Sequence, residues 1–586
     1  MQTRTHRTRR PRRKDGADHG PTAIGRAIQR ATRLLLGGDG LRALRGLRGT
    51  LEKYPDCGQL HARHGDALYL AARLAQARDA YQRAVSLDDT IFQAWYGLGC
   101  TYFSAEAYAA AIESFRRAVA LDAGDADARM YLGRSLFHMG YVDEAIDELR
   151  AVAKIAEPDL RRKALGQIAT IIPGSPMRGN AEVMKSRVAW ARQEARFERR
   201  MARTPVGTRA RRLGPSRSEK LRIGYVSAFF CSRNWMKPMW GVINEHDRSS
   251  FEIHLFWDVQ DPTAAKEYQR HARDSIHDIN GLSNEEAARR IRKVGVDVLV
   301  DLNGYSFRNR LGMFMRKPAA VQFAVFCMYA TTGIRAFDYV VSDAVTLPVE
   351  EERFCTERVL RVSGSYLAFR VQYPVPRVVP PPCMKNGFMT FGCLAPQYKI
   401  TDEVIATWAQ ILTHAPTSRL ILKSTCLDQS SNRAAVLARL ARFGVASKRV
   451  TLERPAEHFT FLKAYGRIDI ALDTFPYNGG TTTMEALWQG VPVLTFNGDR
   501  WASRTSRTLV LAARLQEWDV PSREDYVERA IALANSRETP AALAALRTGM
   551  RARLLDSAAC DGGRLCRELE QHYKNTFRPN RTPATR

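Results

Sequence analysis

The sequence predicts an all-α repeat array followed by two α/β domains, each built on a parallel sheet. Small residues recur at a fixed period through the first third of the chain, and strand-like apolar runs alternate with helical patterns from Leu221 onward. A Pro-rich segment at 371–382 divides this alternation into two series. The 586 residues, 45% of them hydrophobic, contain enough apolar mass for several cores. At about 150 residues per domain, the length fits three or four domains.

The repeats are defined by several positions that agree in phase. Gly65, Gly99 and Gly133 recur every 34 residues. A period of 34 with a small residue where two helices cross is typical of tetratricopeptide repeats. The same spacing holds for Ala77, Ala111 and Ala145 and for Tyr81, Phe115 and Leu149, with a degenerate first copy over 22–56. We expect residues 22–156 to form a superhelix whose concave face binds peptides or proteins.

The remainder alternates strand and helix. Strand-like runs include LRIGYVS, FEIHLFW, VDVLVD, VQFAVF and DYVVSD in one series, and FMTFGCL, RLILK, RVTLE, IDIALD and VPVLTF in the other. Near-continuous apolar strands predict parallel sheets covered on both faces, and thus two Rossmann-like domains with a ligand at the carboxyl ends of the strands. The predicted parts are a basic tail at 1–21, the repeats at 22–156, a helical linker at 157–218, a domain at 219–370, a Pro-rich linker at 371–386 and a domain at 387–575.

The formal net charge of +28 is the least ordinary bulk property. It suits a polyanion, an anionic membrane surface or a phosphate-bearing substrate, although arginines crowded into a tail and a linker are ordinarily only solvated. No helix-turn-helix or RNA-binding sheet motif accompanies the charge, so nucleic-acid binding is not favoured. No apolar run of about 18 residues or secretory h-region occurs. Ten scattered cysteines without zinc spacing predict a cytoplasmic protein with no metal site.

One turn has the chemistry of a phosphate site. In IDIALDTFPYNGGTTTMEALWQG a strand ends in Gly479 and Gly480, which let the backbone approach a ligand, and a helix begins at Thr481 and Thr482. Hydroxyls and free N–H groups at a positive helix end suit a diphosphate. Glu485, one turn further on, is placed to accept a hydrogen bond from a ribose hydroxyl. An ordinary helix N-cap explains the same residues without a ligand.

Longer motifs resemble a known family. The repeats followed by DLNGYS, RKPAAVQ, ATTG, FDYVVSD, QYKI, LDTFPYNGGTTTMEALWQGVPVLTF and ASR look like the O-GlcNAc transferase/SPINDLY family of glycosyltransferases, over roughly residues 25–560. The resemblance implies a glycosyltransferase B fold of two Rossmann-like domains. It also implies inverting transfer from a nucleotide sugar, usually UDP-GlcNAc, to Ser or Thr of proteins, with no metal or other cofactor.

The resemblance also carries over a nucleotide-sugar site. Lys399 of QYKI falls on the donor diphosphate, where an ammonium offsets the charge developing on the leaving UDP. The family motifs place further donor contacts at Asn303, Ser306, Gln397, Gly480, Thr481, Thr482, Glu485 and Arg504, with Ser503 beside the last. For Asn303, Ser503 and Arg504, a purely structural role is the alternative.

The sequence departs from the family near the sugar and the acceptor. Family members carry a His shortly after the first strand of the catalytic region, where this chain has Arg233. A guanidinium cannot act as a base near neutral pH, but it can bind a phosphate or an acidic acceptor, so Arg233 remains a candidate catalytic residue. Cys327 and Ala330 replace family glycines. Two alternatives follow: the same fold with another donor, such as GDP-fucose or UDP-glucose, or another acceptor, and a non-catalytic repeat adaptor that retains nucleotide.

Overall fold

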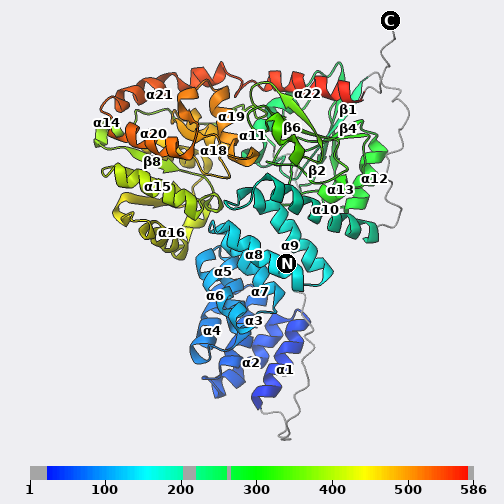
Figure 1. Cartoon of the computed structure of the whole chain (residues 1–586). Coiled ribbons are helices and arrows are strands. Elements are labelled where there is room, and N and C mark those ends of the chain that lie inside the picture. The colour runs from blue at the N-terminus through cyan, green and yellow to red at the C-terminus, as the bar shows by residue number, and fades with distance from the viewer. Residues whose placement is uncertain (1–22, 202–219, 260–264, 578–586) are drawn as a thin grey trace.

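The computed structural model describes residues 23–201, 220–259 and 265–577, and leaves out the side chains of residues 233 and 234. The predicted basic tail and the arginine-rich part of the predicted linker lie outside these residues. In Figure 1 a helical array forms the lower part of the molecule and a broad α/β unit lies above it. The predicted order of an all-α array followed by two Rossmann-like domains is confirmed.

Four helix pairs form the repeat array. The crossings are as close as the spacing predicts, because a Cβ atom added to Gly65 would lie 2.6 Å from the ring of Tyr81. At Gly99 the same distance to the ring of Phe115 is 2.6 Å, so a side chain at either glycine would force the helices apart. The helices are α1 (Ala23–Leu36), α2 (Gly40–Lys53), α3 (Gly58–Leu70), α4 (Leu74–Leu87), α5 (Phe92–Ser104), α6 (Tyr108–Leu121), α7 (Ala126–His138) and α8 (Val142–Ile155).

Two further helices join the array to the first sheet. They are α9 (Pro158–Ile171), followed by the short η1 (Ile172–Gly174), and α10 (Asn180–Met201). Arg187 of α10 is fully buried and donates from Nη1 to the carbonyls of Met328 at 3.0 Å and Thr331 at 2.7 Å. The described part of the predicted helical linker is therefore packed onto the first α/β domain.

The first α/β domain has a seven-stranded parallel sheet in the order β3-β2-β1-β4-β5-β6-β7. The strands are β1 (Leu221–Ser227), β2 (Phe251–Trp257), β3 (Ser275–Asp278), β4 (Val298–Asp301), β5 (Val321–Ala324), β6 (Tyr339–Asp343) and β7 (Arg358–Val362). The helices are α11 (Arg233–Asn244), α12 (Asn284–Val294), α13 (Leu311–Phe314) and η3 (Val349–Phe354). Sequence reasoning missed β3 and β7, because these edge strands are short and too exposed to form an apolar run.

The second domain has a six-stranded parallel sheet in the order β10-β9-β8-β11-β12-β13. Its strands are β8 (Thr390–Cys393), β9 (Arg419–Lys423), β10 (Val450–Glu453), β11 (Ile470–Leu472), β12 (Val493–Phe496) and β13 (Asp519–Val520). The helices before the Gly-rich turn are α14 (Cys383–Asn386), η4 (Gln397–Lys399), α15 (Asp402–His414), η5 (Thr425–Asp428), α16 (Ser430–Arg442), η6 (Ser447–Arg449), α17 (His458–Lys463) and η7 (Ala464–Arg467). Those after it are α18 (Thr481–Trp488), η8 (Trp501–Ser503), α19 (Thr505–Ala512), η9 (Gln516–Trp518), α20 (Arg523–Asn535) and α21 (Thr539–Leu555).

The last helix crosses back to the first domain. Helix α22 (Gly562–Phe577) packs against α11 and β7, and the N–H of Phe369 donates to the carbonyl of Ala559 at 2.8 Å. In Figure 1 α22 lies over the first sheet. The segment predicted as one domain, 387–575, thus contributes its final helix to the other one.

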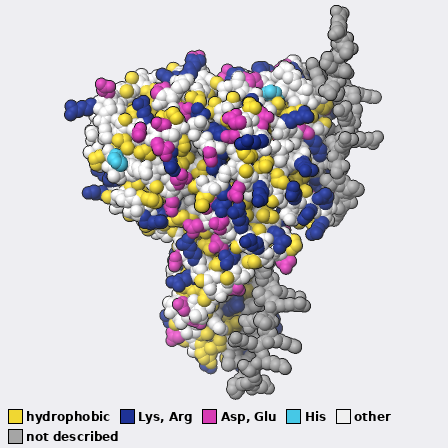
Figure 2. Space-filling model, viewed as in Figure 1, with side chains coloured by type: hydrophobic (Ala, Val, Ile, Leu, Met, Phe, Trp, Pro, Cys, Tyr) yellow, Lys and Arg dark blue, Asp and Glu magenta, His cyan; other side chains and the backbone are white. Residues whose placement is uncertain are grey.

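The described surface carries part of the positive charge. Figure 2 shows Lys and Arg side chains over much of this face, including the region of α10 and α12. The exposed cations of these helices are Lys185, Arg192, Arg196, Arg199 and Arg200 on α10, and Arg289, Arg290, Arg292 and Lys293 on α12. Among the described helices, none is both long and apolar enough to cross a membrane.

Candidate active site between the two sheets

Loops at the carboxyl ends of both sheets meet at one place. Tyr329, which follows β5, contacts Tyr477, which follows β11, with ring centroids 5.2 Å apart. On the second-domain side a cavity is lined by the ends of β8 and β11 and by the start of α18, including Asp473, Gly479 and Thr482. This is where a doubly wound sheet binds its ligand.

Lys399 lies within this region as a cation without a matching anion. Its Nζ donates to the carbonyl of Asn478 at 2.6 Å and lies 4.0 Å from the ring centroid of Tyr477. Among the described residues, no carboxylate lies within ion-pair distance of it. Burial lowers the pKa of Lys399 to about 8, although the more distant Asp473 acts in the opposite direction. A half-buried ammonium held only by a carbonyl and a ring is suited to accept an anionic ligand.

Asp473 holds the Gly-rich turn in place through hydrogen bonds. Its Oδ1 accepts from the N–H groups of Thr474 and Gly479, both at 3.0 Å, and its Oδ2 accepts from Thr495 Oγ1 at 2.8 Å. Burial raises the pKa of Asp473 to about 6. The side chain of Asn478 adds a hydrogen bond from Nδ2 to the carbonyl of Thr474 at 2.6 Å. The turn that leads into α18 is therefore preorganised, and Gly480 is its N-cap residue.

Two predicted donor contacts adjoin this turn. Gln397 is buried, and neither its Oε1 nor its Nε2 has a hydrogen-bond partner among the described residues. An unpaired buried amide costs free energy unless a ligand satisfies it. Thr481 and Thr482 are half-buried in the first turn of α18, and the carbonyl of Thr482 accepts from Tyr465 Oη at 2.9 Å.

Glu485 has partners that the sequence did not reveal. Its Oε1 accepts from Lys237 Nζ at 2.5 Å and contacts His458 Nε2 at 2.9 Å. Lys237 belongs to α11 of the first domain, and its Nζ also lies 4.7 Å from the ring centroid of Tyr373. The carboxylate predicted to bind ribose thus takes part in a buried contact between the two domains. Lysine in an otherwise apolar stretch, WMKPMW, was the signal that could have drawn attention to Lys237.

Asn303 and Ser306 lie in the loop that follows β4. Asn303 Oδ1 accepts from Ser227 Oγ at 2.9 Å and from the N–H of Ala228 at 3.0 Å, so its side chain fixes the loops after β1 and β4. Gly304 has a φ of 52°, and a Cβ there would lie 2.1 Å from the carbonyl oxygen of Cys327. Cys327 itself has a φ of 59°. Cys327, which replaces a glycine of the family, therefore keeps the left-handed backbone conformation that favours glycine.

Arg504 and Ser503 do not point to a ligand. Arg504 Nη1 donates to the carbonyl of Thr346 at 3.1 Å, its Nε to that of Gly498 at 2.7 Å, and its Nη2 pairs with Glu351. Ser503 Oγ accepts from the N–H of Arg500 at 3.0 Å. Because Arg504 is buried and its guanidinium is bonded on all sides, we assign it to bracing the two domains rather than to the donor.

The remaining candidate, Arg233, is the first residue of α11, and its side chain lies outside the described residues. The structure therefore gives no test of the hypothesis that it binds a phosphate or an acidic acceptor.

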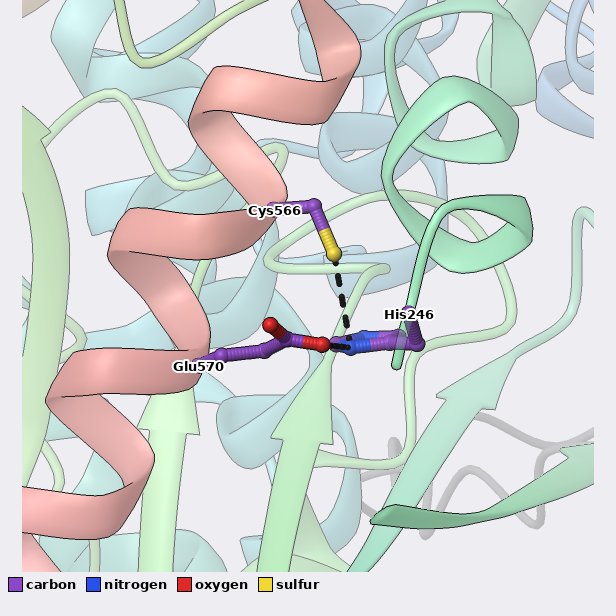
Figure 3. A group of neighbouring side chains, drawn as sticks. All are labelled: His246, Cys566 and Glu570. Carbon is purple, nitrogen blue, oxygen red and sulfur yellow. Dashed lines mark hydrogen bonds and ion pairs between the residues drawn. The ribbon is translucent and has the colours of Figure 1, made fainter. Parts of the chain in front are cut away.

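One cluster elsewhere has the donor types of a metal site. Figure 3 shows His246 facing Cys566 and Glu570 of α22, with ligand atoms all within 4.8 Å of one another. Glu570 Oε1 lies 2.9 Å from His246 Nδ1 and accepts from the N–H of Asp247 at 2.8 Å, while His246 Nε2 lies 2.7 Å from Tyr225 Oη. Burial lowers the pKa of His246. These groups already satisfy one another, so we assign the cluster to anchoring α22 on the first domain.

Models of known protein families match most of this chain. The model of "Glycosyl transferase family 41" matches residues 205–369 and 384–569, and two tetratricopeptide-repeat models match 28–90 and 102–167. The solved structure of a Thermobaculum terrenum O-GlcNAc transferase mutant is similar, with a TM-score of 0.73 and 31% identity. The similarity covers 89% of this chain and 97% of that one.

Curated relatives include plant proteins. The tomato protein "Probable UDP-N-acetylglucosamine--peptide N-acetylglucosaminyltransferase SPINDLY" is 31% identical over 366 residues, which are 61% of this chain and 39% of the relative. The Arabidopsis thaliana protein of the same name ending in SEC is 27% identical over 380 residues, covering 63% of this chain and 38% of that protein. The chain thus spans about two fifths of the length of these relatives.

Proposed function

This chain belongs to glycosyl transferase family 41, and on that premise we propose that it is an inverting protein O-glycosyltransferase. The proposed reaction moves GlcNAc from UDP-GlcNAc to Ser or Thr of protein acceptors, as the names of its relatives suggest. The nucleotide sugar is a co-substrate, and the proposal includes no metal or other cofactor.

The observation that carries the proposal is the position of Lys399. A half-buried ammonium faces the fixed Gly-rich turn, with no carboxylate at ion-pair distance among the described residues. The start of α18 adds backbone N–H groups and a positive helix end at the same turn. A diphosphate bound there would complete the charge balance, and Lys399 would stabilise the negative charge that develops as the sugar leaves.

Other residues of the chain have roles in binding. The free amide of Gln397 is suited to donate to and accept from the nucleotide. Glu485 reaches a ribose hydroxyl only if its contact with Lys237 is shared or exchanged when the donor binds. The domain contact of α11 with α18 is therefore part of the donor site in this proposal.

Two alternatives differ in substrate or in activity. Replacement of the family His by Arg233, and of glycine by Cys327, leaves GDP-fucose and UDP-glucose as alternative donors. A non-catalytic adaptor would need the repeats and the nucleotide but no transfer. The intact set of Lys399, Gln397 and the Gly479–Gly480 turn supports an active enzyme over an adaptor.

The repeats support protein acceptors as partners, and we propose the cytoplasm as the location. All ten cysteines are unpaired, which agrees with a reducing compartment.

The test is a thermal-shift panel of UDP-GlcNAc, UDP-glucose and GDP-fucose in the presence of a chelator, followed by transfer assays with protein substrates. We expect UDP-GlcNAc to raise the melting temperature most and to label Ser or Thr. A larger increase in melting temperature with GDP-fucose would identify GDP-fucose, and not UDP-GlcNAc, as the donor. Donor binding without transfer to any acceptor would support the non-catalytic adaptor.

A further inference from the structure

Three aromatic side chains occupy one position in three consecutive repeats. Tyr69, Phe103 and Phe137 are 34 residues apart and lie near the ends of α3, α5 and α7, the first helices of their repeats. All three are partly exposed. Equivalent positions of stacked repeats lie on one face of the array, so we call these residues the aromatic column.

Neighbouring side chains extend the aromatic surface. The guanidinium of Arg134 lies 4.6 Å from the ring centroid of Phe103 and 5.3 Å from that of Tyr131. The ring of His138 lies 6.2 Å from Phe103 and 5.7 Å from Phe137. Burial lowers the pKa of His138 to about 4, so this ring is neutral at neutral pH. Arg134 is consequently the single cation among these five side chains.

The column is continuous with the candidate active site. Phe137 stacks on Tyr398 of the second domain, with ring centroids 4.9 Å apart and an interplanar angle of 23°. The ring centroids of Tyr398 and Tyr477 are 6.2 Å apart, and Lys399 Nζ lies 4.0 Å from the ring centroid of Tyr477. A segment bound along the column would therefore reach the residue proposed to bind the donor diphosphate.

We propose that the column binds the acceptor as an extended, proline-rich segment with a ring-stacking side chain at every third residue. First helices of successive repeats pack on each other, and packed helices lie about 8–10 Å apart. A polyproline II segment repeats every three residues and rises about 3.1 Å per residue, so one turn matches one repeat. Aromatic surfaces bind such segments because their conformation is already ordered.

The charge of the surface favours this occupant. A strongly acidic segment would need several cations, whereas the column and its ring neighbours offer Arg134 alone. Flat rings with little charge suit proline and aromatic side chains. This inference rests on the proposed protein transferase function, and it adds the chemistry of the acceptor segment.

The experiment compares two acceptor peptides of identical composition. One has proline at every third residue over three turns, the other has the same prolines in a permuted order, and each is made with the acceptor Ser at either end. We expect KM for the spaced peptide to be about tenfold lower, on the scale of two or three stacking contacts.

The variant Phe103→Leu keeps apolar bulk but removes the ring. It should raise KM for the spaced peptide by about three- to tenfold, the scale of one aromatic contact, and leave KM for the permuted peptide unchanged. Leu121→Ala, an exposed position at the end of α6, is the control and should change neither value.

The possible outcomes separate the two proposals. Equal KM values for the two peptides in an active enzyme would overturn the column as an acceptor surface and leave the transferase function standing. An equal effect of Phe103→Leu on KM for both peptides would also overturn the column as an acceptor surface, because the ring would then not distinguish the two proline spacings. No transfer to any peptide or protein would instead overturn the proposed function.

Discussion

Lys237 Nζ lies 2.5 Å from Glu485 Oε1, so a cation of the first domain forms an ion pair with the helix that starts at the Gly-rich turn. The two side chains are 3% and 6% exposed. This pair links the packing of the two domains to the site proposed for the donor.

Lys237→Met should lower the free energy of unfolding by about 3–5 kcal/mol, because it leaves the buried carboxylate of Glu485 without its cation. Adding Glu485→Gln should recover part of this loss, since the uncompensated charge is then gone. Urea unfolding of the two single variants and the double variant measures the coupling. Additive effects would show that the pair contributes no coupling free energy.

Lys399→Ala should raise the barrier to transfer by about 2–4 kcal/mol, because in the proposed mechanism the ammonium acts mainly as charge builds on the leaving group. The donor KM should change less than kcat. Lys423→Ala is the control, since Lys423 is a buried lysine of the same domain and pairs with Glu453 at 3.4 Å. Wild-type kcat in the Lys399 variant would remove this residue from the mechanism.

The pKa of Lys399 predicts an alkaline limit of activity. Burial lowers this pKa to about 8, so the ammonium needed by the donor is lost as the pH rises through about 8 in the free enzyme. We expect kcat/KM for the donor to fall above that pH, whereas kcat should fall at higher pH because bound diphosphate raises the pKa. Lys399→Arg keeps its charge and should remove the alkaline fall. The same fall in that variant would assign the limit to another group.

Deletion of residues 1–87 should separate acceptor recruitment from chemistry. Helices α1–α4 stack on one another and on α5, whereas later repeats hold the second domain through contacts such as Asn432 Nδ2 to the carbonyl of Glu106 at 2.8 Å. The shortened protein should therefore remain folded and modify a short peptide while losing much of its activity on full-length acceptors. Relative rates on the two substrates test this, and a parallel loss of both would place α1–α4 in the catalytic unit.

Arg233→Ala should raise KM for the donor or for an acidic acceptor, and Arg233→His should not simply give a more active enzyme. Arg233 is the first residue of α11, the helix whose Lys237 contacts Glu485. Arg289→Ala on α12 is an exposed arginine control. Unchanged kinetics in the Arg233 variant would overturn the assignment.

Local patterns in the sequence determined much of this protein. The 34-residue period fixed the repeats because Gly65 and Gly99 are needed wherever two helices cross closely. Apolar runs predicted the central strands, since these are buried on both faces. The Gly-rich turn predicted the helix start at Gly480 and Thr481, because a turn and a helix start depend on adjacent residues. Lys399 was implied by the resemblance of QYKI to the family, and its contact with the donor stays a prediction.

Only the tertiary structure decided which distant residues meet. Glu485 is paired with a lysine 248 residues away, Arg504 is bound by Glu351 of the other domain, and α22 returns to the first sheet. The short edge strands β3, β7 and β13 were also missed. Contacts of this kind depend on how two sheets and a repeat array dock, which leaves no local periodicity in the chain. Burial then sets the charge state of a group such as Lys399, because desolvation acts through the packed surroundings and not through sequence neighbours.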